Sequence, residues 1–482
     1  MACGGAFAVL VFFKGLVPPD ADTLWHVAQG RLLLRRWAEG DLGLDLQDTF
    51  SWTAKGVPWH SNAWGFDALV AGFHDAGQWL GVAALRVVLL AALIVGAWAA
   101  SRHGGAGRWA RAAAVWVTVL FIVPSSAMRP QLVSFVLVLA CLALAGRALD
   151  AGRSGGVDGP TWPRSPIASL AVLAVTIAVW AALHGAVVAG VVAIVAACVG
   201  DARDRRAWRR PAVTAAVAVA ASCLSPHGAR VWAYAMSTSG DSVQEGIQEW
   251  QPPSLSRGQD VVITAFLVIV AAVAISTRWS GRRPFPWRLL APALLLTVLA
   301  FQAVRNEPLA LLALLPFTAS ALEAAGAWLG RRGWAPPVHP GRALAAMTLG
   351  ALLGGSIQAG ALPFDPDPLQ SSEFPHTAAA ALPGGCRLLN EYDDGGYLIY
   401  ARPDVPVSQD GRNDLYGPAR LEVQERLLHD RSPERAAGSL RRLGVTCVLL
   451  RSDRELAHAL AQIPGWRRVA ADEIAEAWVR SS

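Results

Sequence analysis

Two carboxylates, Asp20 and Asp22, stand one residue apart near the start of the chain, with Trp25 and His26 directly behind them. They follow a short apolar run at residues 6–17, where a first membrane-spanning helix would end. An ionisable side chain at a membrane boundary is costly unless it is solvated or functional. A carboxylate there can accept a proton from an attacking hydroxyl or bind a divalent cation. We therefore expect the floor of an active site at this point.

Further polar side chains stand at the ends of later apolar runs, and loop charge predicts that all lie on the same, outer face: Arg129, His184, His227, Glu249 and Arg305. A guanidinium binds phosphate bidentately, so Arg129, Arg305 or Arg412 could hold a phosphate group. Each residue alone has a simpler interpretation, because a single arginine at a span end commonly snorkels toward water. Since several occur at one depth on one face, we predict that they share a site with Asp20 and Asp22.

Two polar motifs mark the C-terminal region. Residues 390–400 contain Asp393, a Gly-Gly pair and Tyr397, and residues 409–414 contain Arg412. Paired glycines after two acids allow a tight turn and a close backbone approach. An acidic surface turn is the alternative interpretation of the first motif.

The composition is that of an integral membrane protein. Of the 482 residues, 54% are hydrophobic and only 16% are charged, whereas soluble domains carry about 25% charged residues. The 20 tryptophans often stand at the ends of apolar runs, as interfacial anchors do. The formal net charge of +6 comes mainly from arginines in short loops between spans. The positive-inside rule explains this charge better than nucleic-acid binding.

The apolar runs predict a mostly α-helical, polytopic fold with about 11 transmembrane helices in residues 1–361. Residues 18–76 are expected to form the first extracytoplasmic loop, with amphipathic helices at the membrane surface. The first span is expected at residues 6–17, and the others are expected at 78–100, 112–128, 130–147, 166–183, 185–200, 211–225, 260–277, 289–304, 307–326 and 343–361.

Arginine clusters fall at every second connection, which predicts that those connections are cytoplasmic. The N-terminus is then cytoplasmic, and the loop from Asp20 lies outside, together with residues 362–482. This last region predicts a small extracytoplasmic α/β domain. Its short apolar runs are at residues 386–392, 397–400, 405–408, 445–450 and 475–479, and its helix-like stretches are at residues 417–430, 432–443 and 453–462. Its two cysteines, Cys386 and Cys447, could pair there, and the six cysteines show no metal-ligand spacing.

The layout resembles the GT-C superfamily of polyprenyl-phosphate-sugar-dependent glycosyltransferases. In that superfamily the first outer loop carries an acidic pair with one catalytic member, which Asp20 and Asp22 match. Residues 390–400 are distantly similar to the WWDYG region of oligosaccharyltransferase catalytic subunits, with Asp393, the Gly-Gly pair and Tyr397 as counterparts. A Glu-Tyr pair replaces the two tryptophans, which argues against recognition of a peptide sequon. The chain also resembles a broad group of bacterial membrane proteins with D-x-x-W-H, R-P-Q, W-x-x-x-H-G, E-W, R-N and D-G-R stretches.

The resemblance implies a multi-pass glycosyltransferase of the bacterial plasma membrane. It would move a sugar from a polyprenyl-phosphate-linked donor to an extracytoplasmic acceptor, with Asp22 or Asp20 as general base. Its partners would be the donor, membrane lipids and the acceptor, with no nucleic acid. The residues expected to bind substrate are His26, Arg129, His184, Glu249, Arg305, Asp393, Tyr397 and Arg412. No cofactor is assigned: the carboxylates and histidines could coordinate Mg²⁺ or Mn²⁺, but many GT-C members resemble metal-independent enzymes.

Two other functions fit the same residues. One is a transporter or flippase for a lipid-linked or anionic substrate, and the other is a non-catalytic GT-C-like scaffold in envelope assembly. Transporters place their polar residues near the membrane midplane. The polar residues here are predicted at one face, beside a sizeable outer domain, which favours the enzyme.

Overall fold

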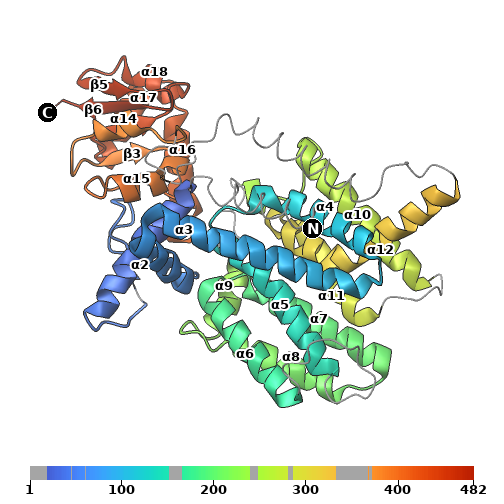
Figure 1. Cartoon of the computed structure of the whole chain (residues 1–482). Coiled ribbons are helices and arrows are strands. Elements are labelled where there is room, and N and C mark those ends of the chain that lie inside the picture. Colours follow the sequence, from blue (N-terminus) through green and yellow to red (C-terminus); the bar gives the residue numbers. More distant parts are fainter. Residues whose placement is uncertain are drawn as a thin grey trace. The chain divides into compact units, whose positions relative to one another are not determined.

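The computed structural model describes residues 19–44, 46–59, 61–150, 165–238, 248–279, 286–332, 367 and 372–481. The chain is mostly helical and divides into two compact units (Figure 1). We call Met1–Gly15 with Ala84–Leu362 the helical unit, and Leu16–Ala83 with Pro363–Ser482 the mixed unit. The spans expected at residues 6–17 and 343–361 lie outside the described residues.

Apolar helices joined by short turns build the helical unit. After the second part of α3 (Trp64–Ala100) they are α4 (Arg108–Ile122), α5 (Pro130–Asp150), α6 (Pro166–Leu183), α7 (Val187–Arg205), α8 (Arg209–Ser222), α9 (Arg230–Thr238), α10 (Gly258–Trp279), α11 (Trp287–Gln302) and α12 (Glu307–Arg331). Short 3-10 turns lie between them: η1 (Ser101–Gly104), η2 (Val123–Ser125), η4 (Gln248–Trp250) and η5 (Val304–Asn306). Two of these turns carry polar residues that the sequence placed at span ends, Glu249 in η4 and Arg305 in η5.

Four helical segments among the described residues are long and apolar enough to cross a membrane: Trp64–Gly104, Pro130–Asp150, Pro166–Leu183 and Val304–Arg331. Two shorter apolar helices cover Asp260–Ile275 and Trp287–Gln302. The structure thus supports a membrane protein, but it does not confirm the predicted total of about 11 spans. Helices α4 and α8 have only 15 and 14 residues, fewer than the about 20 that span a bilayer directly.

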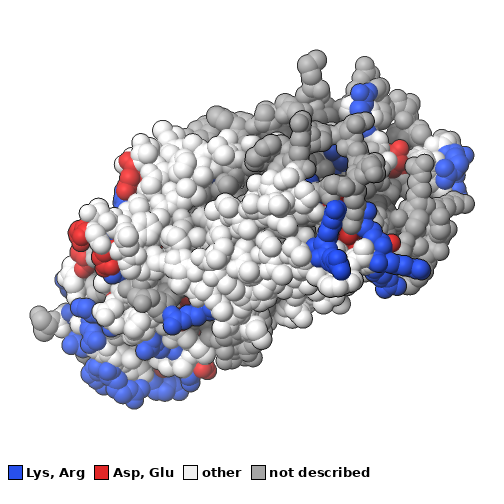
Figure 2. Space-filling model, turned by 90° about the horizontal axis from the view of Figure 1, so that it is seen from below, with Lys and Arg blue, Asp and Glu red and all other residues white. Residues whose placement is uncertain are grey.

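Exposed apolar residues lie on α6. Ile167 and Val175 are 80% and 64% exposed. Exposed apolar residues of this kind are unusual on a helix of a water-soluble protein. The face drawn in Figure 2 likewise has broad areas without charged side chains. Contact with lipid accounts for these surfaces, because hydrocarbon does not penalise them.

The mixed unit contains a four-stranded sheet in the order β3-β4-β6-β5. Strands β3 (Leu388–Asn390) and β4 (Cys447–Leu450) are parallel, whereas β6 (Glu476–Arg480) is antiparallel to both β4 and β5 (Trp466–Ala471). The helices of this unit are α2 (Ala21–Ala38), the first part of α3, α14 (His376–Ala380), α15 (Gly395–Ala401), α16 (Asn413–Leu428), α17 (Pro433–Leu443) and α18 (Glu455–Leu460), with the 3-10 turn η7 (Tyr392–Asp394). Apolar side chains of α16, α17, α18, β4 and β6 form its core.

The early segment of the chain is built into this unit. Strands β1 (Leu46–Gln47) and β2 (Pro58–Trp59) form an antiparallel pair. Between them, Ser51 forms a parallel bridge with Val407, and the indole of Trp52 donates to the carbonyl of Leu388 in β3 at 2.7 Å. These contacts link residues more than 330 positions apart in sequence.

Cys386 and Cys447, whose pairing the sequence left open, form a disulfide with 6.0 Å between the two Cα atoms. This disulfide joins the chain just before β3 to the first residue of β4, so it fastens the edge strand β3 to its parallel neighbour β4.

Candidate functional site

The acidic doublet forms the N-terminal end of α2. Asp20 is the N-cap residue, and its Oδ1 accepts hydrogen bonds from the Thr23 amide at 3.0 Å and the Thr23 hydroxyl at 2.7 Å. This bonding is the usual reason for an aspartate at a helix start. Asp22 lies in the first turn, and its Oδ1 accepts from the indole of Trp25 at 3.1 Å. The partial positive charge of the helix N-terminus favours a carboxylate at both positions.

His26 lies one turn further along α2, in a buried hydrogen-bonded pair. Its Nδ1 lies 2.5 Å from Oδ1 of Asp67, whose Oδ2 accepts from the hydroxyl of Ser61 at 2.6 Å. His26 and Asp67 are 4% and 0% exposed, and the His26 ring stacks on Trp25 with centroids 3.6 Å apart. Sequence reasoning missed Asp67. The feature of the sequence that could have identified Asp67 is a single acidic residue near the start of a long apolar helix.

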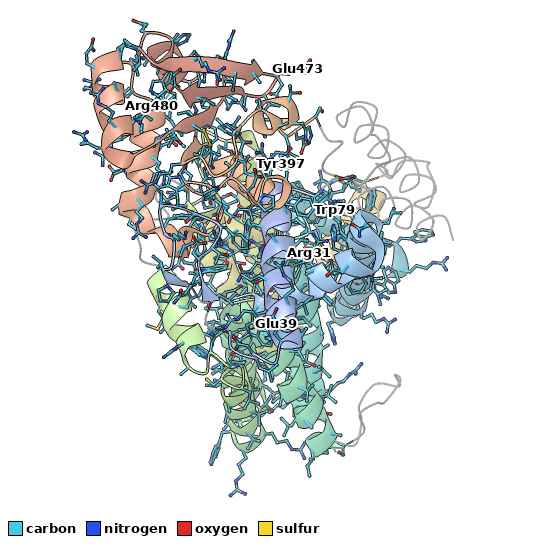
Figure 3. All side chains as sticks on the ribbon, turned by 90° about the vertical axis from the view of Figure 1, so that its left-hand side faces the viewer. Arg31, Glu39, Trp79, Tyr397, Glu473 and Arg480 are labelled. Atoms are coloured by element: carbon cyan, nitrogen blue, oxygen red, sulfur yellow. A yellow bond between two sulfur atoms is a disulfide. The ribbon has the colours of Figure 1, made fainter. Side chains whose placement is uncertain are left out.

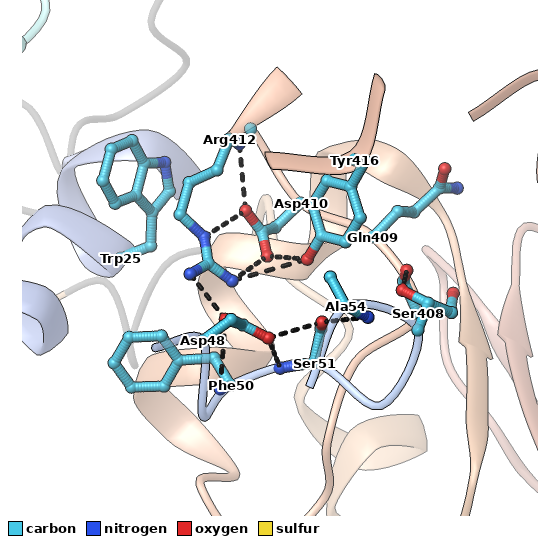
Figure 4. Close-up of polar contacts among 12 residues, drawn as sticks. Trp25, Asp48, Phe50, Ser51, Ala54, Ser408, Gln409, Asp410, Arg412 and Tyr416 are labelled. Carbon is cyan, nitrogen blue, oxygen red and sulfur yellow. Dashed lines mark hydrogen bonds and ion pairs between the residues drawn. The ribbon is translucent and has the colours of Figure 1, made fainter. Parts of the chain in front are cut away.

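Arg412 is the centre of a buried network (Figure 4). Its Nη1 donates to Oδ1 of Asp48 at 2.7 Å, and its Nε and Nη2 donate to the two oxygens of Asp410 at 2.8 and 2.7 Å. The hydroxyl of Tyr416 donates to Asp410 Oδ2 at 2.5 Å, and that of Ser51 donates to Asp48 Oδ2 at 2.6 Å. The network thus joins the β1–β2 segment to the motif at residues 409–414.

The surroundings of Arg412 favour a structural role. Its guanidinium lies 5.2 and 5.1 Å from the ring centroids of Phe50 and Trp59, and the side chain is fully buried. Burial alone would lower the pKa of Arg412, but the adjoining Asp410 and Asp48 carboxylates raise it well above its usual value. A guanidinium already held by two carboxylates has little capacity left for a phosphate.

The first C-terminal motif divides into exposed and buried groups. Asp393 is exposed in η7, whereas the neighbouring Asp394 is buried. Burial, with the nearby charges of Glu391 and Asp393, raises the pKa of Asp394 to about 7. Tyr397 is a core residue: its ring stacks on Phe374 with centroids 4.8 Å apart, and its hydroxyl lies 2.8 Å from Nδ1 of His376.

Both C-terminal motifs reach the start of α2. Gly396 in α15 contacts the carbonyl of Ala21, and Gly411 contacts the carboxylate of Asp22. Figure 3 shows Tyr397 of α15 and Arg31 of α2 within the mixed unit, and the Arg31 guanidinium lies 5.9 Å from the ring of Tyr400 at the other end of α15. The mixed unit therefore brings Asp20, Asp22 and His26 together with both motifs.

Four predicted site residues lie in the helical unit. Glu249 of η4 and Arg305 of η5 form an ion pair at 3.8 Å, and the Arg305 guanidinium lies 3.7 Å from the ring centroid of Trp250. His184 ends α6, and its Nδ1 lies 2.7 Å from the hydroxyl of Ser134. Arg129 precedes α5 and is partly buried. The structure brings Glu249 and Arg305 together, and a site shared by all the candidate residues stays a prediction.

A buried arginine in α3 was not among the candidates. Arg86 is 4% exposed, and its Nε and Nη2 donate to the carbonyl of Ser126 at 3.1 and 2.9 Å. An arginine inside a membrane-spanning helix is rare and commonly functional. Its signal in the sequence was a single charge within the apolar run at residues 78–100.

A metal centre receives no support from the residues that the structure describes. Among them, no group of three or more His, Cys, Asp or Glu side chains is arranged to hold a metal ion. Asp20 caps a helix, Asp22 accepts from Trp25, and His26 is paired with Asp67.

The fold of this chain is similar to that of known proteins, whereas its sequence is not. No protein-family model matches the chain, and no curated protein sequence matches it. The oligosaccharyltransferase AglB from Archaeoglobus fulgidus, in complex with an inhibitory peptide and a dolichol-phosphate, superimposes with a TM-score of 0.58 at 13% identity, covering 92% of this chain and 68% of AglB. ArnT from Cupriavidus metallidurans in the apo state gives 0.58 at 14% identity, covering 98% and 96% of the two chains. ArnT bound to undecaprenyl phosphate gives 0.55 at 15% identity.

These matches confirm the distant similarity to GT-C glycosyltransferases that the motifs indicated. At 13–15% identity the similarity concerns the fold. It extends over nearly the whole chain, so both compact units take part in it.

Proposed function

We propose that this protein is a membrane glycosyltransferase that moves a sugar from a polyprenyl-phosphate-linked donor to an extracytoplasmic acceptor. The observation that carries the proposal is the Asp22 carboxylate in the first turn of α2, in a chain whose fold matches ArnT over 98% of its length. The lipids named with the neighbours, dolichol-phosphate and undecaprenyl phosphate, support a polyprenyl carrier.

In the proposed reaction, the oxygen of an acceptor hydroxyl attacks the anomeric carbon of the donor sugar. As this bond forms, the bond between the anomeric carbon and the phosphate oxygen breaks, and the polyprenyl phosphate leaves with the electron pair. Asp22 accepts the proton of the attacking hydroxyl as general base. A guanidinium offsets the negative charge that develops on the leaving phosphate.

Asp22 is a better candidate for the base than Asp20. The Oδ1 of Asp20 accepts two hydrogen bonds from Thr23, so this side chain starts the helix. The Oδ1 of Asp22 accepts a hydrogen bond from the indole of Trp25, which orients this carboxylate in the first turn of α2. The buried His26–Asp67 pair lies one turn further along α2, and the His26 ring stacks on Trp25, the residue that donates to Asp22.

A transfer assay tests the proposal. The full-length protein in lipid nanodiscs is incubated with a panel of radiolabelled sugars linked to undecaprenyl phosphate and with a cell-envelope fraction as acceptor. We expect one donor to release undecaprenyl phosphate while label enters the acceptor fraction, and we expect Asp22→Asn to abolish both. Asp453→Asn, which changes a 75% exposed carboxylate of the same unit, should leave transfer unchanged.

In closed proteoliposomes, movement of the labelled lipid across the membrane without release of the carrier would instead identify a transporter. If the Asp22→Asn variant released undecaprenyl phosphate at the wild-type rate, the role of Asp22 as general base would be contradicted.

A further inference from the structure

Three glycines mark places where backbone segments of the mixed unit meet without room for a side chain. A Cβ on Gly395 would collide with the carbonyl of Gln409, and one on Gly396 would collide with the carbonyl of Ala21. A Cβ on Gly411 would collide with Oδ1 of Asp22 and would lie 3.1 Å from Nε1 of Trp25. The start of α15, the loop at residues 409–412 and the first turn of α2 therefore fit directly against one another.

The loop that carries Gly411 is fixed on its N-terminal side by β3. Asn390 is the last residue of this strand. Its side-chain Nδ2 donates to the carbonyl of Gln409 at 2.9 Å, and its Oδ1 accepts from the backbone amide of Ser408 at 2.8 Å. Ser408, Gln409 and Asn390 are all buried, so water does not compete for these bonds.

On its C-terminal side the loop is fixed by the buried charges. The backbone amide of Arg412 donates to Oδ1 of Asp410 at 2.9 Å, which closes the turn around Gly411. The guanidinium of the same residue then joins Asp410 to Asp48 on the β1–β2 segment. A turn held by charged hydrogen bonds on both sides of one glycine has little freedom to move.

We propose that Gly411 and Trp25 together position the Asp22 carboxylate, and that the Asp48–Arg412–Asp410–Tyr416 network acts through Gly411 as a set of positioning residues. The indole of Trp25 donates to Oδ1. The Gly411 backbone lies against the same oxygen and prevents the carboxylate from turning to that side. The D-G-R motif thus fixes the orientation of Asp22 instead of binding phosphate.

The catalytic consequence rests on the proposed function. A general base must lie within hydrogen-bonding reach of the proton that it accepts, and a misplacement of about 1 Å can cost about 100-fold in rate. The positioning itself can be measured without any substrate, because the Trp25 hydrogen bond favours the ionised carboxylate.

The direct test is the reactivity of Asp22 toward a water-soluble carbodiimide, measured by peptide mass spectrometry across a pH series on the full-length protein in detergent. The reagent consumes the protonated carboxyl, so labelling falls as pH rises. In Gly411→Ala the added methyl displaces Oδ1 from Trp25, and we expect the pH midpoint of Asp22 labelling to rise by about one unit. Trp25→Phe, which removes the indole N–H but keeps an aromatic ring, should shift it in the same direction.

Gly438→Ala is the matched control, because a Cβ at Gly438 in α17 meets no atom within 4 Å. It should leave the Asp22 midpoint at the wild-type value. Fragment spectra quantify Asp20 and Asp22 separately. If Gly411→Ala does not fold, the Trp25→Phe profile decides alone. Wild-type midpoints in both variants, or in Trp25→Phe where it decides alone, would overturn the positioning role.

With the donor found in the transfer assay, Gly411→Ala should lower kcat at least about 10-fold with little change in KM. Asp22→Asn is measured beside it. Transfer retained by Asp22→Asn would refute the proposed base while leaving the labelling result intact. Loss of transfer in Asp22→Asn with unchanged kcat in Gly411→Ala would refute the positioning role alone.

Discussion

Asp20 and Asp22 have different roles although only one residue separates them. Asp20 starts α2 by accepting from Thr23, and Asp22 is held by Trp25 and Gly411. The sequence predicted that this doublet was important, because charge at a span end is costly. It could not assign the two roles, because Gly411 approaches Asp22 from 389 positions further along the chain, and local patterns do not report such contacts.

Asp394 should make the stability of the mixed unit depend on pH. Its pKa is raised to about 7 by burial and by the neighbouring Glu391 and Asp393, while Arg451 partly opposes this effect. An unfolded aspartate titrates near about 3.9, so between about pH 4 and pH 7 the folded state keeps a proton that the unfolded chain has lost. The stabilisation is complete below that range and is lost as pH rises to about 7.

We therefore expect the melting temperature of the wild-type protein to fall between pH 5 and pH 8, and Asp394→Asn to reduce this fall. Asp393→Asn, at the exposed neighbouring position, should keep most of it. Thermal unfolding in detergent at the two pH values measures both. An unchanged slope in Asp394→Asn would show that this carboxyl does not bind the extra proton.

Truncation of Arg412 should destabilise the protein strongly. Arg412→Ala leaves Asp48 and Asp410 buried without their cation, a change that costs about 3–5 kcal/mol. Arg426→Ala removes an exposed pair with Glu422 at 3.4 Å and should cost less than about 1 kcal/mol. Denaturant unfolding of the two variants gives the comparison, and equal losses would mean that the buried network is not needed for the fold.

At the scale of elements, the sequence anticipated the helices of the C-terminal region better than its sheet. The helix-like stretches at residues 417–430, 432–443 and 453–462 overlap α16, α17 and α18. The apolar run at residues 397–400 suited a strand by length, but it belongs to α15. Its Tyr397, Leu398 and Ile399 side chains are buried and α15 packs against α2, so burial and not strand pairing explains the run.

Strand β5 (Trp466–Ala471) was not among the short apolar runs, because it carries two exposed arginines, Arg467 and Arg468. It lies at the edge of the sheet and pairs only with β6. Edge strands commonly carry charged residues that discourage pairing with other chains. Because its exposed positions are charged, β5 does not form a continuous apolar run and was not predicted as a strand.

The disulfide is expected to stabilise the same sheet. Cys386 and Cys447 are 61 residues apart in sequence, so replacing both with serine should lower the free energy of unfolding by about 2–4 kcal/mol. Reductant should lower the melting temperature of the wild-type protein and leave that of the double variant unchanged. Cys223→Ser is the control, because Cys223 forms no disulfide. A reductant effect that persists in the double variant would contradict this assignment.

At the scale of the whole molecule, the sequence predicted the fold class from apolar runs and loop charge, and the structural comparisons confirm the GT-C similarity. The number of membrane spans could not be predicted reliably, because α4 and α8 have only 15 and 14 residues, fewer than the about 20 that span a bilayer. The division into residues 1–361 and 362–482, and the orientation in the membrane, stay predictions.

Cysteine labelling tests the orientation. We expect Lys55→Cys, on the exposed turn between β1 and β2, to react with an impermeant thiol reagent added to intact cells. Arg206→Cys, at the end of α7 within a basic connection, should react only after the cells are opened. Ser61 is unsuitable for such a probe, because it is 5% exposed and bonded to Asp67. The reverse pattern would place the acidic doublet in the cytoplasm.

The most direct measurement of the central claim is the kcat for sugar transfer from an undecaprenyl-phosphate-linked donor by Asp22→Asn and Asp20→Asn side by side. A general base contributes about 100-fold or more, so Asp22→Asn should lose at least that factor. Asp20→Asn, which keeps a side-chain oxygen able to cap α2, should retain most of the rate. Comparable rates in Asp22→Asn and the wild-type protein would contradict the account.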